Sequence, residues 1–135
     1  AFICLANMLS QDVYFQFYRL QLDEVRQLTG VFDIFFQDNL PLLYEHMQEQ
    51  GVMSEMFLID WLLTLYCKVL PLEATARVWD GFLYEGEIHS IRVALGILKY
   101  TAPKLRELDF VEIRQYVYIE PRMSVVFAVG IVAPD

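Results

Sequence analysis

The amino-acid sequence predicts an all-α fold, and three observations carry this prediction. Apolar residues recur at spacings of three and four along most of the chain, which is typical of helices with one buried face. No convincing alternation of period two, the pattern of a strand, occurs before residue 116. Proline and glycine separate several of the periodic segments, as they do where one helix ends and the next begins.

Three helical segments are predicted in the N-terminal third. Residues 2–10 form a short apolar helix, and residues 13–22 form an aromatic-rich segment. A longer helix is expected over residues 22–37, and Gly30 should weaken it without ending it. Its buried face is predicted to consist of Val25, Leu28, Phe32, Phe35 and Phe36.

The next two helices are bounded by local signals. Pro41 should start a new helix that runs through residue 50, because proline suits a first turn, and Gly51 should end it. Ser54 is a candidate N-cap for a helix over residues 55–69. This segment is apolar nearly all round, so we expect a central, buried helix.

Proline and glycine also bound the remaining segments. Pro71 should open a helix that Gly86 closes. Ser90 is then expected to cap a helix that Pro103 interrupts, and residues 108–118 form a last amphipathic helix. The apolar run over residues 123–133 has no helix caps, and we interpret it either as a strand or, preferably, as an unmatched end.

Composition limits the classes of function. The chain has 135 residues, which suits one domain, and 56% of them are hydrophobic. Such an excess indicates either a nearly all-core piece of a larger unit or a face that a partner covers. A net charge of −8 disfavours nucleic acid as a partner, and no apolar run is long enough for a transmembrane segment. Because the helical pattern of apolar residues has already begun at Ala1, we expect this chain to be a fragment of a longer protein.

Residues of the kinds that carry catalysis or bind metals are sparse. Cys4 and Cys67 lie in apolar helical patterns and are expected to be buried thiols in a reducing compartment. His46 and His89 have no second ligand three or four residues away, so no metal site is expected. The chain contains neither a nucleophile elbow nor a phosphate-binding glycine loop, and no cofactor is predicted.

Arg77 is the residue that most invites a catalytic interpretation. Glu73 precedes it by four residues and Asp80 follows it by three, so both carboxylates can flank the guanidinium on one helix face. We interpret the three as a partly buried charge cluster with a structural role, and we reject an arginine finger because two anions hold the side chain. The neighbouring apolar stripe, which we expect to carry Trp79 into the core, consists of Leu72, Ala76, Trp79 and Leu83.

Five sequence blocks resemble the TBC domain, the all-helical domain of GTPase-activating proteins for Rab-type GTPases. They are AFICL at the N-terminus, NLPLL with His46, IDWLLTLY, LPLEATARVWDGFLYEG and RVALGIL, in the family's order. The resemblance covers residues 1–118 and implies a multi-helix orthogonal bundle, here the C-terminal half of a TBC domain; residues 119–135 are an unmatched apolar tail. The motif residues to which it assigns a structural role are Asn39, Pro41, Trp61, Pro71, Glu73, Arg77, Trp79, Asp80, Gly86 and Arg92.

The resemblance also implies a mechanism. In the family, an arginine in IxxDxxR and a glutamine in YxQ act on GTP that the partner GTPase carries with its Mg²⁺. This chain contains no IxxDxxR string. Tyr14-Phe15-Gln16 fits YxQ, but it follows the AFxxL block instead of preceding it, and the family's next glycine is replaced by Phe17. We therefore interpret Tyr14 and Gln16 as a chance match, and expect both catalytic fingers upstream of Ala1.

The expected partner is a Rab-type small GTPase, and the expected process is vesicle traffic. The segment LIDWLLTLYCKVLPL resembles the subgroup linked to endosomes and autophagy. A cytoplasmic protein is expected, and peripheral recruitment to endosomal or autophagic membranes through the rest of the protein stays open. The alternative is a non-catalytic helical adaptor that binds a Rab or trafficking protein without stimulating hydrolysis.

Overall fold

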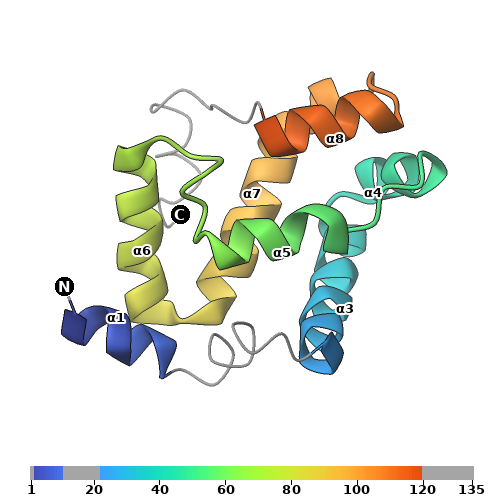
Figure 1. The fold of residues 1–135 in the computed structure, drawn as a ribbon. Helices are drawn as coiled ribbons and strands as arrows, with labels where there is room; N and C mark the ends of the chain where they lie inside the picture. Colours follow the sequence, from blue (N-terminus) through green and yellow to red (C-terminus); the bar gives the residue numbers. More distant parts are fainter. Residues whose placement is uncertain (1, 11–21, 120–135) are drawn as a thin grey trace.

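The computed structural model describes residues 2–10 and 22–119, and everything below concerns this part of the chain. The regular elements in it are helices, with no strand, which confirms the all-α prediction (Figure 1). The predicted helix over residues 13–22, the Tyr14 to Gln16 string and the apolar run over residues 123–133 lie outside the described residues.

The helices are arranged around a short central one, as Figure 1 shows. Helix α5 lies across α7, with α6 on one side and α3 on the other, and α4 packs against α3. This crossing arrangement agrees with the orthogonal bundle implied by the resemblance. The bounds are α1 Phe2–Leu9, α3 Leu22–Asn39, α4 Pro41–Glu49, α5 Glu55–Leu63, α6 Leu72–Glu85, α7 Glu87–Leu105 and α8 Phe110–Ile119.

The core is organised by aromatic rings. Neighbouring rings are 5.0 to 6.4 Å apart between centroids, in tilted or edge-to-face geometry, which is the arrangement that aromatic pairs prefer. The rings run from α4 through α3 into α5 and the turn behind it, and they belong to Tyr44, Phe36, Phe32, Phe57, Trp61 and Tyr66. The predicted buried face of α3 is thus largely confirmed, with Phe35 as the exposed exception.

Helix α5 ends earlier than predicted. It stops at Leu63 instead of residue 69, because Leu65 and Tyr66 take left-handed backbone conformations with φ of 45° and 64°. The amide of Tyr66 donates to the carbonyl of Trp61, and that of Leu65 to Leu62, which together form a Schellman motif. A glycine usually occupies the left-handed position of this motif, so the sequence carried no signal for it.

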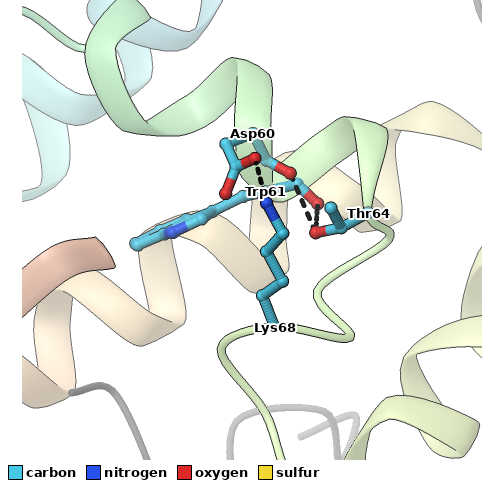
Figure 2. A network of polar contacts seen from close by, with 4 residues as sticks. All are labelled: Asp60, Trp61, Thr64 and Lys68. Carbon is cyan, nitrogen blue, oxygen red and sulfur yellow. Dashed lines mark hydrogen bonds and ion pairs between the residues drawn. The ribbon is translucent and has the colours of Figure 1, made fainter. Parts of the chain in front are cut away.

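Side chains secure this turn (Figure 2). The hydroxyl of Thr64 donates to the carbonyl of Asp60 at 2.8 Å, and the Lys68 ammonium reaches the Asp60 carboxylate, also at 2.8 Å. Farther in, the buried Tyr66 hydroxyl donates to the carbonyl of Ser90 in α7 at 2.5 Å. These hydrogen bonds, together with the burial of the Leu65 and Tyr66 side chains, can offset the backbone strain at these two residues.

Two predictions about α7 are wrong. Ser90 does not cap a helix but lies buried inside α7, and Pro103 does not interrupt the helix, which continues to Leu105. A proline inside a helix removes one backbone hydrogen bond, so its cost is limited when it falls in the last turn. Leu98 and Leu105, both fully buried, anchor the helix on either side of it.

We predict that replacing the central tryptophan will cost about 3–5 kcal/mol of unfolding free energy. In Trp61→Ala, a cavity opens between the rings of Phe57 and Tyr66, which now touch the indole on both sides. Urea denaturation followed by circular dichroism measures the change. The matched control is Val111→Ala at an exposed position of α8, which should stay within about 0.5 kcal/mol. Equal effects of the two substitutions would contradict the central role of Trp61.

Candidate functional site

Helix α6 carries the motif that drew attention in the sequence. It begins at Leu72 after Pro71, has Glu73 in its first turn, and ends where Gly86 adopts a positive φ of 75°. These bounds confirm the prediction from proline and glycine. The side chains that α6 buries, on the face from which it packs against α7, are Ala74, Thr75, Val78 and Phe82.

The neighbouring apolar stripe of α6 lies at the surface, which corrects the prediction that it carries Trp79 into the core. Leu72 is 84% exposed, Leu83 is 62% exposed and Trp79 is 38% exposed. The indole N–H of Trp79 donates to the carbonyl of Leu65 at 3.3 Å, so the ring lies against the turn behind α5. α6 thus has two apolar stripes, of which the one with Ala74, Val78 and Phe82 is buried.

The predicted charge cluster around Arg77 is also absent. Arg77, Glu73 and Asp80 are all exposed, and no ion pair within 4.0 Å joins Arg77 to either acid. Helix-surface pairs of this kind are worth only a few tenths of a kcal/mol, too little to hold long side chains out of water. The two anions therefore do not restrain Arg77, which removes the reason for rejecting it as a finger.

A different polar cluster joins the end of α6 to α7. Glu85 Oε2 is 3.1 Å from Nδ1 of His89 and 2.8 Å from Nη1 of Arg92. The hydrogen bond from His89, helped by the charge of Arg92, lowers the pKa of the Glu85 carboxyl against the opposing effect of desolvation. Arg92, expected as a structural motif residue, thus forms an ion pair that joins the end of α6 to α7.

His89 is buried and packs directly on Gly81. A Cβ atom at residue 81 would lie 2.2 Å from both Cε1 and Nε2 of the imidazole, so any other residue there would force the His89 ring to move. Among the described residues, Nε2 of His89 is a buried side-chain nitrogen with no hydrogen-bond partner. The sequence interpretation missed this pair, although a glycine inside a predicted helix is a signal of close approach.

The other motif residues lie apart from this corner. The Asn39 amide donates to the carbonyl of Phe35 at 2.8 Å, Pro41 is the first residue of α4, and Trp61 is in the core. His46 Nε2 lies 3.0 Å from the carbonyl of Leu108. Cys67 is exposed and free, which corrects the expectation of a buried thiol.

The described part of the chain offers no metal site. Nowhere in it do three histidine, cysteine or acidic side chains gather closely enough to hold an ion. None of its helices is both long and apolar enough to cross a membrane.

We predict opposite effects for two glycine substitutions. Gly81→Ala should lower the unfolding free energy by about 1–3 kcal/mol, because the methyl group would overlap the His89 ring. Gly30→Ala is the matched control inside α3, where nothing lies within 4 Å of the new methyl group. It should raise the unfolding free energy by about 0.5–1 kcal/mol. Thermal denaturation measures both, and a neutral Gly81→Ala would contradict the close packing.

We predict that Glu85 contributes to acid sensitivity. Because folding lowers its pKa below about 4.5, the unfolded chain binds the proton more tightly. The stabilisation is therefore present above about pH 4.5 and is lost as pH falls through the folded pKa. Urea titrations between about pH 3 and 6 should show a shallower decline for Glu85→Gln than for the wild type, and parallel curves would rule this contribution out.

Comparisons with known proteins agree with this architecture. The model of the Rab-GTPase-TBC domain matches residues 1–106. The chain is 39% identical over 116 residues to TBC1 domain family member 12 of Xenopus tropicalis and 37% identical to TBC1 domain family member 14 of Homo sapiens. Each match covers 86% of this chain but 17% of the relative. Drainin of Dictyostelium discoideum is 32% identical over 112 residues, which are 83% of this chain and 26% of the relative. The chain therefore belongs to the Rab-GTPase-TBC domain family.

Proposed function

We propose that this chain is the C-terminal half of a TBC domain whose parent protein stimulates GTP hydrolysis by a Rab-type GTPase. The observation that carries the proposal is the family match over residues 1–106, supported by the all-helical bundle and the five motif blocks in family order. The partner GTPase supplies GTP and Mg²⁺, and the chain binds neither. Its own contribution is the helical framework and part of the surface that the GTPase contacts.

Stimulation is proposed to require residues that this chain does not contain. The resemblance assigns the chemistry to an arginine in IxxDxxR, and no such string occurs in the sequence. Arg92 is held by Glu85 at the α6–α7 corner, where it serves structure. Arg77 is exposed and unrestrained by ion pairs, but it belongs to the RxWD block, to which the family gives no finger. Arg77 is therefore the residue to test directly.

A non-catalytic adaptor is the second candidate. The observation that favours it is the missing IxxDxxR string together with the exposed apolar side chains of α6, which suit binding better than chemistry. An adaptor of this kind would bind a Rab or another trafficking protein and leave the hydrolysis rate unchanged. The enzyme-activating function has the stronger support, because the motif blocks follow the family throughout the matched region.

We propose a cytoplasmic location for the parent protein, with peripheral recruitment to endosomal or autophagic membranes through its other regions. The support is the resemblance of LIDWLLTLYCKVLPL to the subgroup linked to that traffic. The names of the matched relatives state no compartment. Co-localisation of the tagged parent protein with endosomal and autophagosomal markers tests the proposal, and a uniform cytosolic distribution under starvation would contradict the recruitment.

Single-turnover GTP hydrolysis by a panel of Rab proteins tests the activity. We predict that the parent protein accelerates hydrolysis by at least one Rab roughly 10³- to 10⁵-fold, the range that an arginine finger supplies. The 135-residue chain alone should leave the rate within about twofold. Rab binding by the parent without acceleration would favour the adaptor instead.

Two substitutions sharpen this test. Arg77→Ala in the parent protein should preserve acceleration, because the residue is exposed and outside the finger motif. Lost acceleration with an unchanged melting temperature would assign Arg77 a catalytic role. If the chain alone accelerates hydrolysis and Gln16→Ala abolishes the effect, the interpretation of Tyr14 and Gln16 as a chance match is wrong.

A further inference from the structure

A pocket of about 210 Å³ lies where α3 ends, α4 begins and α7 ends. It opens to the surface beside the NLPLL block, and none of the residues that line it belongs to the Glu85–His89–Arg92 cluster at the α6–α7 corner. The side chains that line it are Asn39, Leu40, Pro41, Leu42, Leu43, Ala102 and Arg106. No residue of this set takes part in the mechanism that the family resemblance implies.

The size and the walls of the pocket limit what it can bind. Pockets for cofactors and drug-sized molecules usually enclose about 300–1,000 Å³, which is more than this pocket offers. A cavity of about 150 Å³ is known to hold a benzene ring, so one large apolar side chain fits. The leucines, Pro41 and Ala102 supply an apolar wall for it.

The positive charge of Arg106 at the rim of the pocket favours a ligand in which an acidic group stands next to the apolar side chain. Arg106 is exposed and forms no ion pair within 4.0 Å in the described part of the chain, not even with Glu107 beside it. Helix α4 also begins at the pocket with Pro41, and no side chain caps its first turn. Both features favour an anion, although the chain as a whole carries a net charge of −8.

We propose that this pocket binds a short peptide segment of a partner protein in which a large apolar side chain stands next to a carboxylate. The apolar side chain occupies the space between the α4 leucines and Ala102, and the carboxylate pairs with the Arg106 guanidinium. This site is separate from GTPase activation, and its test does not depend on the proposed function.

NMR titration of the ¹⁵N-labelled 135-residue chain tests the proposal with two defined peptides. The first is the end-blocked octapeptide GSGFDGSG, and the second, GSGFKGSG, replaces the acid by lysine. The acidic peptide should cause saturable shifts at Leu42, Leu43 and Arg106 with a dissociation constant no weaker than about 1 mM. The lysine peptide should bind at least tenfold more weakly.

Matched variants assign the binding to this pocket. Arg106→Glu should reverse the preference toward the lysine peptide, whereas Lys99→Glu, the same charge reversal at an exposed position within α7, should keep the preference for the acidic peptide. Leu42→Ala should weaken binding several-fold, and Ile34→Ala, with nearly the same exposure (62% against 61%), should not. Equal binding of the two peptides, no saturable shift, or an unchanged preference in Arg106→Glu would overturn the proposal.

Discussion

Burial of the short helix α5 is the interaction on which the other helices depend. Nine residues are too few for a helix that is stable in water, so α5 depends on the burial of Phe57, Leu58, Trp61 and Leu62 on one of its faces. Trp61 contacts the rings of Phe57 and Tyr66, and through Phe57 the stacking continues into α3. The helices α3 and α7 pack against this one element, which is why the bundle is orthogonal and not a set of parallel helices.

Local chemistry explains what could be predicted from the sequence. Pro41 and Pro71 fix backbone angles by themselves, and Gly51 and Gly86 reach positive φ without steric cost, so the ends of α4 and α6 follow from single residues. The end of α5 does not. Leu65 and Tyr66 hold left-handed backbone with the help of long-range contacts, among them the hydrogen bond from the Tyr66 hydroxyl to the carbonyl of Ser90, 24 residues away. No local pattern encodes such a contact.

The candidate site shows the same division. That α6 carries a motif of the family could be predicted from the order of the blocks, but which of its two apolar stripes is buried could not. Periodicity treats the stripe of Leu72 and Leu83 as equal to that of Val78 and Phe82, and only the packing of the folded domain distinguishes them. Spacing also placed acids within reach of Arg77, whereas solvation decides whether such surface pairs close. Gly81, inside a helical segment, was a local signal of the close packing on His89 that the sequence did offer.

The turn at Leu65 and Tyr66 makes α5 a segment whose local preference conflicts with its place in the fold. The helical pattern of residues 55–69 continues past Leu63 in the sequence. In the folded domain the chain turns there instead, and the Leu65 carbonyl accepts a hydrogen bond from the indole N–H of Trp79. This is local frustration in the sense of folding landscapes: the apolar pattern is that of a continuing helix, whereas the folded domain has a turn there. A lost contact with α6 would therefore not simply loosen the turn. The strained backbone of Leu65 and Tyr66 would then be less well offset, and the connection from α5 to α6 would lose its shape.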